Sequence, residues 1–285
     1  LDVVDCPCSR EAPRLLVVGA ALNYGSFPRA IVWTPSAGMQ ALPTLTGGNV
    51  ESVAFSASAN ASVIVGWSVN GAGSPRPVLW LNGAISDLGT LGGDWGQAYG
   101  ISRDGSIVVG EAQQSFDAGN QGHAFRWQNG GMSDLGTLSN RIISAAFGVS
   151  ANGEIVVGIA ANGENDPLAV RWDAFGIEAL PLPMGYEASW AFRCSADGSV
   201  VVGWIGDADT LRIEAVRWVD RQVQRLGMLN GLDTGAYDVS ADGSIVVGGA
   251  GNPFGFELER AIRWTASGGM EDLNITYADL LRDGS

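Results

Sequence analysis

Residues 98–138 read AYGISRDGSIVVGEAQQSFDAGNQGHAFRWQNGGMSDLGTL and contain four short β-type runs separated by turn signals. The second run, which ends in glycine, recurs six times: LLVVG (15–19), VIVG (63–66), IVVG (107–110), IVVG (155–158), VVVG (200–203) and IVVG (245–248). A tryptophan follows each copy in the same order: Trp33, Trp80, Trp127, Trp172, Trp218 and Trp264. Self-similarity at this period is the signature of a repeat fold.

Each repeat is expected to form four strands. The first is a run such as Ala98–Ser102, and a D-G turn such as Asp104-Gly105 leads to the glycine-ending run. The third strand ends in the tryptophan, and a short turn leads to the fourth. Four strands in about 40–45 residues match one propeller blade. The sequence therefore predicts an all-β propeller of about six four-stranded antiparallel blades, with seven blades and a truncated chain as the alternative.

The predicted domain organisation is a lead-in over residues 1–14 and a single propeller domain over residues 15–285. The repeats lie near 15–50, 51–95, 96–142, 143–188, 189–233 and 234–285. The first repeat lacks its first strand, and residues 1–4 are a candidate strand beside it. The tail DLLRDGS (279–285) aligns with DVSADGS (238–244), so we expect the tail to supply the missing strand and close the ring.

The string His123-Ala124-Phe125-Arg126-Trp127, followed by GGMSDLGTL (130–138), resembles the HAF family of extracellular repeats. The resemblance covers roughly residues 15–275, but only this copy keeps the literal triplet. The expected equivalents elsewhere begin at Arg29, Pro77, Leu168, Glu214 and Arg260. The resemblance implies a secreted or cell-surface protein, as in autotransporter passengers, and it brings no catalytic residues to transfer.

The composition excludes several classes of function. A formal net charge of −14 and a pI near 4.3 argue against nucleic acid and anionic membranes as partners. All 16 basic residues are arginine, so no lysine is present for Schiff-base chemistry. A single histidine rules out a histidine-rich metal site. The longest early apolar run, Leu15–Leu22, is too short for membrane insertion, and the start at Leu1 leads us to expect a removed leader or an excised fragment.

The three cysteines are Cys6, Cys8 and Cys194. One disulfide with one buried thiol is favoured over a Cys-x-Cys metal or redox clip, because metal sites normally need four ligands. No cofactor is expected. The acidity leaves calcium as a candidate ion, although the chain has neither an EF-hand loop nor a nonapeptide loop.

The repeated tryptophans are expected to form the structural core, since each occupies the same register of a third strand. Arginines precede four of them: Arg126, Arg171, Arg217 and Arg263. The acids of the fourth strands, Asp87, Asp134 and Asp272, are expected to pair with these arginines.

Function is expected where the repeat varies. The loops that follow the second strands differ in length and share a face with the connections between blades. The aromatic and acidic residues assigned to this face are Tyr24, Phe27, Trp67, Asp94, Trp95, Phe116, Asp117, Tyr186, Glu187, Trp190, Trp204, Asp207, Asp209 and Phe254.

Arg193 and Asp238 occupy equivalent places in adjacent first strands and are expected to meet near the axial channel, as a structural pair or a ligand clamp. The predicted ligand-binding residues are Trp67, Asp94, Trp95, Tyr186, Glu187, Trp190, Arg193, Trp204 and Asp238; the competing interpretation is that the aromatics cap the core.

Three functions follow from this pattern. The leading hypothesis is a non-catalytic, secreted or surface-exposed module that binds a glycan or a surface protein. The second is a glycosidase or polysaccharide lyase that uses the carboxylates Asp94, Glu187, Asp207, Asp209 and Asp238. The third is a structural or assembly subunit that associates with copies of itself.

Overall fold

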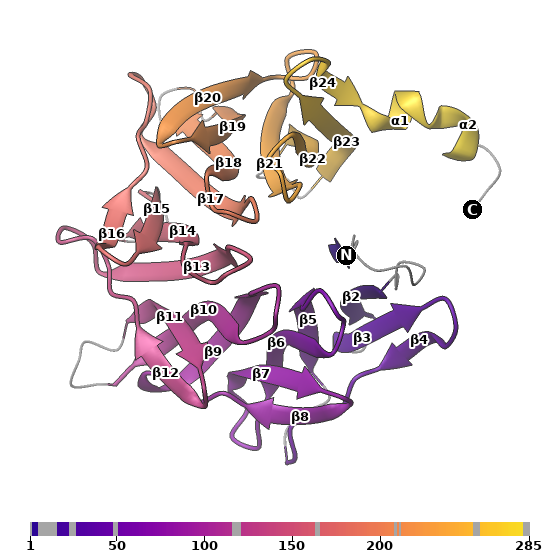
Figure 1. The fold of residues 1–285 in the computed structure, drawn as a ribbon, viewed down its shortest axis with the longest axis vertical. Coiled ribbons are helices and arrows are strands. Elements are labelled where there is room, and N and C mark those ends of the chain that lie inside the picture. The colour runs from indigo at the N-terminus through magenta and orange to yellow at the C-terminus, as the bar shows by residue number, and fades with distance from the viewer. Residues whose placement is uncertain are drawn as a thin grey trace. The chain divides into compact units, whose positions relative to one another are not determined.

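The chain folds as an all-β, six-bladed β-propeller built from small antiparallel sheets (Figure 1). The computed structural model describes residues 2–4, 16–22, 27–47, 51–115, 121–162, 166–207, 210, 212–252 and 257–281. Each sheet has four strands that pair in sequence order. The predicted fold class and strand number per blade are therefore confirmed.

The sheets follow one another along the chain. The first three contain β1 (Asp2–Val4), β2 (Leu16–Ala21), β3 (Arg29–Thr34) and β4 (Gly38–Ala41); β5 (Ser52–Ala57), β6 (Val63–Val69), β7 (Pro75–Leu81) and β8 (Ala84–Asp87); and β9 (Gly92–Ile101), β10 (Ile107–Gln114), β11 (Gly122–Gln128) and β12 (Gly131–Asp134). The last three contain β13 (Ile143–Val149), β14 (Val156–Ala161), β15 (Leu168–Asp173) and β16 (Gly176–Ala179); β17 (Ala188–Cys194), β18 (Val200–Asp207), β19 (Arg212–Val219) and β20 (Gln222–Gly227); and β21 (Asp233–Val239), β22 (Ile245–Asn252), β23 (Glu257–Thr265) and β24 (Gly269–Asp272). We number these sheets blades 1 to 6.

The chain divides into two compact units. Unit 1 comprises residues 1–137 and 143–153, and unit 2 comprises residues 138–142 and 154–285. The contacts described below lie within one unit or the other.

Blade 1 obtains its first strand from the N-terminal segment, because β1 pairs with β2. The tail instead forms two short helices, α1 (Leu273–Thr276) and α2 (Ala278–Leu281) (Figure 1). Asp272 caps α1 by accepting a hydrogen bond from the backbone of Asn274. The expectation that residues 279–285 supply a strand is therefore wrong for residues 279–281, and residues 282–285 lie outside the described part. The reason is local: a capping aspartate starts a helix directly after β24.

The glycine that ends the second-strand run allows a close backbone approach in blades 2, 3, 5 and 6. A Cβ atom on Gly66 would stand 1.9 Å from the carbonyl oxygen of Val53, and one on Gly203 would stand 1.7 Å from that of Trp190. The first strand carries a bulge at this level in both blades, which brings its carbonyl close to the second strand. Any side chain here would force the two inner strands apart, which explains the recurrence of this glycine.

The turn between the first and second strands is held by its own side chains. Asp104 accepts hydrogen bonds from the Ser102 hydroxyl (2.6 Å) and the Ser106 backbone (3.0 Å). The Ser102 hydroxyl in turn accepts from the backbone of Ile107 (3.0 Å). The same contacts in blade 5 lower the pKa of Asp197 to about 2, the largest cause being the Ser195 hydroxyl.

A second repeated contact joins neighbouring blades. In four blades the middle alanine of the HAF-type triplet donates its backbone N–H to a serine or threonine hydroxyl at the start of the next blade, a contact that we call the serine clamp. The pairs are Ala30–Ser52 (3.0 Å) and Ala124–Ser144 (2.9 Å) in unit 1, and Ala169–Ser189 (2.8 Å) and Ala215–Thr234 (3.0 Å) in unit 2. All four alanines are fully buried, so this clamp satisfies backbone donors that water does not reach.

Blade 2 lacks both the donor and the acceptor of this contact with the next blade. Val78 pairs with Gly66 as Phe125 pairs with Gly110, so Pro77 occupies the alanine position and has no N–H to donate. The facing residue at the start of blade 3 is Gly96, which has no hydroxyl. This register also corrects the triplet of blade 2, which begins at Arg76 rather than at Pro77.

We expect Ser189→Ala to lower the free energy of unfolding by about 1–2 kcal/mol, because the buried N–H of Ala169 would lose its acceptor. Chemical denaturation of the variant measures this. Ser133→Ala, at an exposed position of β12, is the matched control and should change stability by less than about 0.5 kcal/mol. Equal effects of the two changes would contradict the clamp.

Candidate functional site

The repeated tryptophans mainly join blades. Trp80, Trp172, Trp218 and Trp264 are buried, whereas Trp33 and Trp127 are half-buried. The indole N–H of Trp80 donates to the carbonyl of Pro43, and that of Trp218 donates to the carbonyl of Pro181, both at 2.8 Å. Each indole thus holds the fourth-strand segment of the preceding blade, as expected for core residues.

The predicted partners of the fourth-strand acids are wrong. Asp87 pairs with Arg76 (3.1 Å), Asp134 with His123 (3.0 Å) and Asp272 with Arg260 (2.5 Å). Side chains alternate between the two faces of a strand. Asp134 lies opposite Phe125, so His123, two residues away, shares its face and Arg126 does not.

The four arginines that precede the tryptophans have other contacts. Arg126 donates to the carbonyl of Gly153, Arg171 lies 3.6 Å from Asp173, and Arg217 stacks 4.3 Å from the ring centre of Trp264. Arg263 pairs with Glu271 at 2.6 Å. These arginines therefore contribute to the scaffold as expected. Their partners differ from the expected ones, because the face of the strand on which each arginine lies determines which side chains it can reach.

Blade 5 reverses the polarity of the repeated ion pair. Glu214 occupies the position of His123, and only 4% of its side chain is exposed. It receives hydrogen bonds from Arg225 (2.8 Å) and from the Tyr186 hydroxyl (3.1 Å). Burial and the bond to Glu214 raise the pKa of Tyr186, and Glu214 raises the pKa of Arg225. The buried carboxylate is thus compensated.

Two tryptophans of blade 5 form a stacked pair. Trp190 of β17 and Trp204 of β18 lie directly opposite each other, with ring centres 5.8 Å apart and planes inclined by 21°. Both are half-buried, and the exposed Glu187 directly precedes β17. We call Trp190 and Trp204 the blade 5 cluster; Glu214 and Arg225 are one residue out of step with them in the register and therefore face the other side of the sheet. Trp204 lies within a strand, not in a loop as expected, because β18 continues to Asp207.

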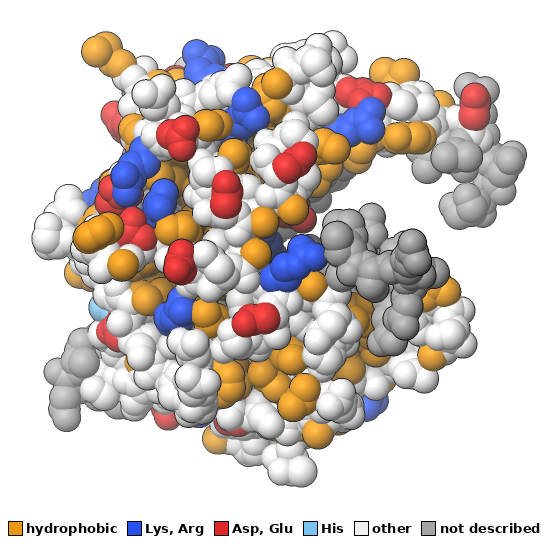
Figure 2. All heavy atoms as spheres, in the orientation of Figure 1, with side chains coloured by type: hydrophobic (Ala, Val, Ile, Leu, Met, Phe, Trp, Pro, Cys, Tyr) orange, Lys and Arg blue, Asp and Glu red, His pale blue; other side chains and the backbone are white. Residues whose placement is uncertain are grey.

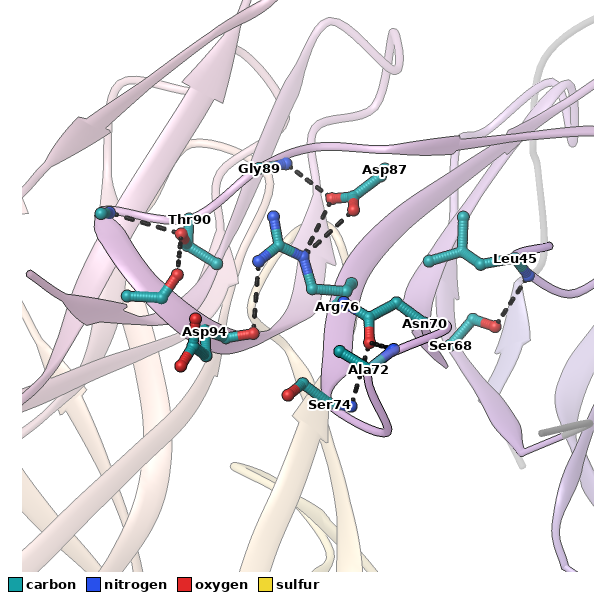
Figure 3. Close-up of polar contacts among 12 residues, drawn as sticks. Leu45, Ser68, Asn70, Ala72, Ser74, Arg76, Asp87, Gly89, Thr90 and Asp94 are labelled. Atoms are coloured by element: carbon teal, nitrogen blue, oxygen red, sulfur yellow. Dashed lines mark hydrogen bonds and ion pairs between the residues drawn. The ribbon is translucent and has the colours of Figure 1, made fainter. Parts of the chain in front are cut away.

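The junction of blades 2 and 3 is bridged by one arginine where the serine clamp is missing (Figure 3). Arg76 of β7 binds Asp87 of β8 and also donates to the backbone carbonyl of Asp94 in β9 (3.2 Å). The hydroxyl of Thr90 bonds to the carbonyl of Gly93 (2.6 Å). Asp94 is therefore held through its backbone, and its carboxylate is exposed.

Blade 3 contains an acidic residue that the sequence analysis missed. Glu111 follows the glycine of β10, at the position that Trp67 and Trp204 occupy in blades 2 and 5. Burial raises the pKa of Glu111 to about 7, against an opposing effect of His123. Trp95 lies close by, since both residues border Gly122. A charged residue inside an apolar strand pattern was the available signal for Glu111 and for Glu214.

The remaining predicted site residues are dispersed. Trp67 lies in β6 between Val53 and Pro77 and is half-buried. Arg193 donates to the carbonyl of Phe192, and the side chain of Asp238 accepts from the backbone of Val239; that they meet stays a prediction. Phe27 is exposed. Tyr24, Phe116, Asp117, Asp209, Phe254, Cys6 and Cys8 lie outside the described residues.

Burial raises the pKa of the Cys194 thiol to about 12, which disfavours the reactive thiolate form.

Among the residues that the structure describes, no group of three or more His, Cys, Asp or Glu side chains is arranged to hold a metal ion. In the same part of the chain, no helix has the length and apolarity needed to cross a bilayer. Figure 2 shows acidic and basic side chains interspersed over the face in view.

These features define a six-bladed β-propeller with aromatic and acidic residues between its blades. No protein-family model matches the chain, and no curated protein matches it. Among solved structures it resembles oligogalacturonate lyase from Vibrio parahaemolyticus (TM-score 0.60, 11% identity, 91% of this chain and 74% of that one). It also resembles TolB from Acinetobacter baumannii (TM-score 0.58, 14% identity, 90% and 62%) and prolyl oligopeptidase B from Galerina marginata (TM-score 0.55, 9% identity, 95% and 41%). The chain thus spans less than two thirds of these last two proteins, and likeness at such identities concerns the fold alone.

Proposed function

We propose that this protein is a non-catalytic, secreted or cell-surface module that binds glycans through the blade 5 cluster. The observation that carries the proposal is the half-exposed, stacked pair of Trp190 and Trp204, in the blade where the exposed Glu187 directly precedes β17. Aromatic rings present a large, rigid apolar surface to the apolar face of a sugar ring, while carboxylates accept hydrogen bonds from its hydroxyls. The resemblance of residues 123–138 to HAF repeats supports the extracellular location.

The charge of the chain supports the same class of partner. A net charge of −14 disfavours anionic polymers, whereas neutral and cationic glycans meet no such repulsion. Trp190 and Trp204 stack on paired strands, so the two rings are positioned before a ligand arrives. Preorganisation of this kind lowers the entropic cost of binding.

The test is a broad panel of immobilised glycans followed by calorimetry with the best ligand. We expect Trp204→Ala to weaken binding at least about tenfold, as loss of a central aromatic contact typically does. The matched control is Phe175→Ala, which removes an aromatic ring that is 97% exposed on the turn between β15 and β16. Its affinity should equal that of the wild type.

Three outcomes would overturn the proposal. The first is that no glycan on the panel binds; if the chain then self-associates in sedimentation experiments, the assembly role gains support. The second is equal affinity of Trp204→Ala and the wild type. The third is cleavage of the bound oligosaccharide into shorter products, which would point to the glycosidase or lyase alternative.

A further inference from the structure

Three glycines shape the surroundings of Glu111 in blade 3. A Cβ atom on Gly122 would stand 2.1 Å from the carboxylate oxygen Oε1 of Glu111 and 3.0 Å from Cη2 of Trp95. One on Gly96 would stand 2.9 Å from the Glu111 carbonyl, and one on Gly93 would stand 2.7 Å from Oε1 of Gln113. Only glycine at position 122 lets the Glu111 carboxyl and the Trp95 ring pack this close to the backbone and to each other. Trp95, Glu111 and Gln113 all retain some exposed surface.

Within the described part of the chain, no arginine pairs with Glu111. Among the described residues, its carboxylate receives no hydrogen bond and forms no ion pair, whereas the buried Glu214 of blade 5 has both Arg225 and Tyr186. A largely buried carboxyl without such partners is costly to ionise. Glu214 thus takes part in an ion pair that stabilises its blade, whereas Glu111 does not take part in such a pair among the described residues.

The titratable groups around Glu111 are few. His123 of β11 acts on its charge, and Tyr99 of β9 has its pKa raised by burial and by Glu111. Strand β13 also packs against β9, β10 and β11, but residues Ile143–Val149 hold no titratable side chain. Among the described residues, the basic group that acts on Glu111 is therefore His123, which already pairs with Asp134.

We propose that Trp95 and Glu111 form a binding site for an ammonium group, and that the ligand is a glycan containing cationic amino sugars. A carboxylate that lacks a partner gains most from a ligand that brings the missing charge. Tryptophan is the strongest cation–π partner among the aromatic residues, and the ring stands beside this carboxylate. The acidic chain steers cations towards it, with the exposed Asp94 carboxylate next to Trp95. This inference deepens the proposed glycan binding by naming its ligand class, and it adds a site in blade 3.

The probe is a tetrasaccharide of glucosamine whose amines are trimethylated, so that its positive charge does not change with pH. Calorimetry at pH 8 should show binding to the wild type, and the uncharged N-acetylated tetrasaccharide should bind at least about tenfold more weakly at this site. Glu111→Gln keeps the shape of the side chain but removes its charge, and we expect it to lose about tenfold or more in affinity. Asp220→Asn is the matched control, since it removes one negative charge from an exposed turn where φ is 49°.

The pH profile supplies an independent readout. Only ionised Glu111 pairs with the cation, so the affinity of the wild type at pH 6 should be about tenfold below its plateau above pH 8. The profile of Glu111→Gln should be much flatter, because a glutamine side chain does not titrate.

The outcomes separate this inference from the proposed function. Equal affinity of Glu111→Gln and the wild type, or an equal loss in Asp220→Asn, would overturn the ammonium site. If Trp204→Ala still abolishes binding of a neutral glycan, the blade 5 proposal stands without it. If the trimethylated probe binds in a Glu111-dependent way while no natural glycan binds, the ammonium site stands and the blade 5 proposal fails.

Discussion

Replacing Trp218 with alanine is expected to lower the free energy of unfolding by about 3–5 kcal/mol, the usual cost of truncating a buried aromatic side chain. Trp218 is 1% exposed and packs among Val157, Val201 and Val216. The change would also remove the hydrogen bond to the carbonyl of Pro181. Urea denaturation followed by circular dichroism measures the effect.

The tryptophan of blade 4 is an internal comparison. The indole N–H of Trp172 is buried and has no hydrogen-bond partner within the described part of the chain. We expect Trp172→Phe to be close to neutral in stability, because it removes an unsatisfied donor. Trp218→Phe should cost about 1–3 kcal/mol, because it leaves a buried carbonyl without its donor. A larger loss in Trp172→Phe than in Trp218→Phe would contradict this account.

Glu111→Gln is expected to change stability in a pH-dependent way. The folded chain raises the pKa of Glu111 from 4.5 to about 7, so the folded state keeps a proton that the unfolded state has lost. The wild type should therefore lose stability as the pH rises from 4.5 to 7, by up to about 3 kcal/mol. Glutamine carries no such proton. The difference in unfolding free energy between Glu111→Gln and the wild type should therefore shift by about 2–3 kcal/mol in favour of the variant as the pH rises from 4.5 to 8.

Unfolding curves at pH 4.5, 6 and 8 test this prediction. Asp220→Asn, at an exposed turn, should show a difference from the wild type that stays nearly constant over the same range. A Glu111→Gln variant that is less stable than the wild type at pH 8 would show that the carboxylate has a partner after all. That result would also remove the basis of the ammonium site.

The sequence predicted the structural repeat better than the contacts between its copies. The glycine of each VVG run, the Asp-Gly turns and the tryptophans recur at constant spacing, and each is tied to a local backbone requirement or to a blade interface. The ion pairs were predicted wrongly. Neighbours in sequence, such as Arg126 and His123, differ in which face of the sheet they occupy, and only strand register decides which one meets Asp134.

The candidate sites were predicted in part. The sequence analysis identified Trp95, Tyr186, Trp190 and Trp204 because these aromatic residues do not belong to the repeated pattern. The structure places Trp190 and Trp204 in one stacked pair. The expected loop location is correct for Tyr186 but wrong for Trp95, Trp190 and Trp204, because β9, β17 and β18 extend further than the repeat suggested. Glu111 and Glu214 were missed, since an acid within a strand gives no sign of whether a cation faces it.

The sequence by itself determined the architecture of this protein. Periodic glycine, serine and tryptophan residues encode a repeated four-stranded unit, because these positions answer steric or hydrogen-bonding needs that recur in several blades. Only the tertiary structure decided which acids are neutralised. Glu214 meets Arg225, whereas Glu111 lies beside Trp95 and the backbone of Gly122. The energy of a buried charge depends on the atoms that surround it, and those come from other strands.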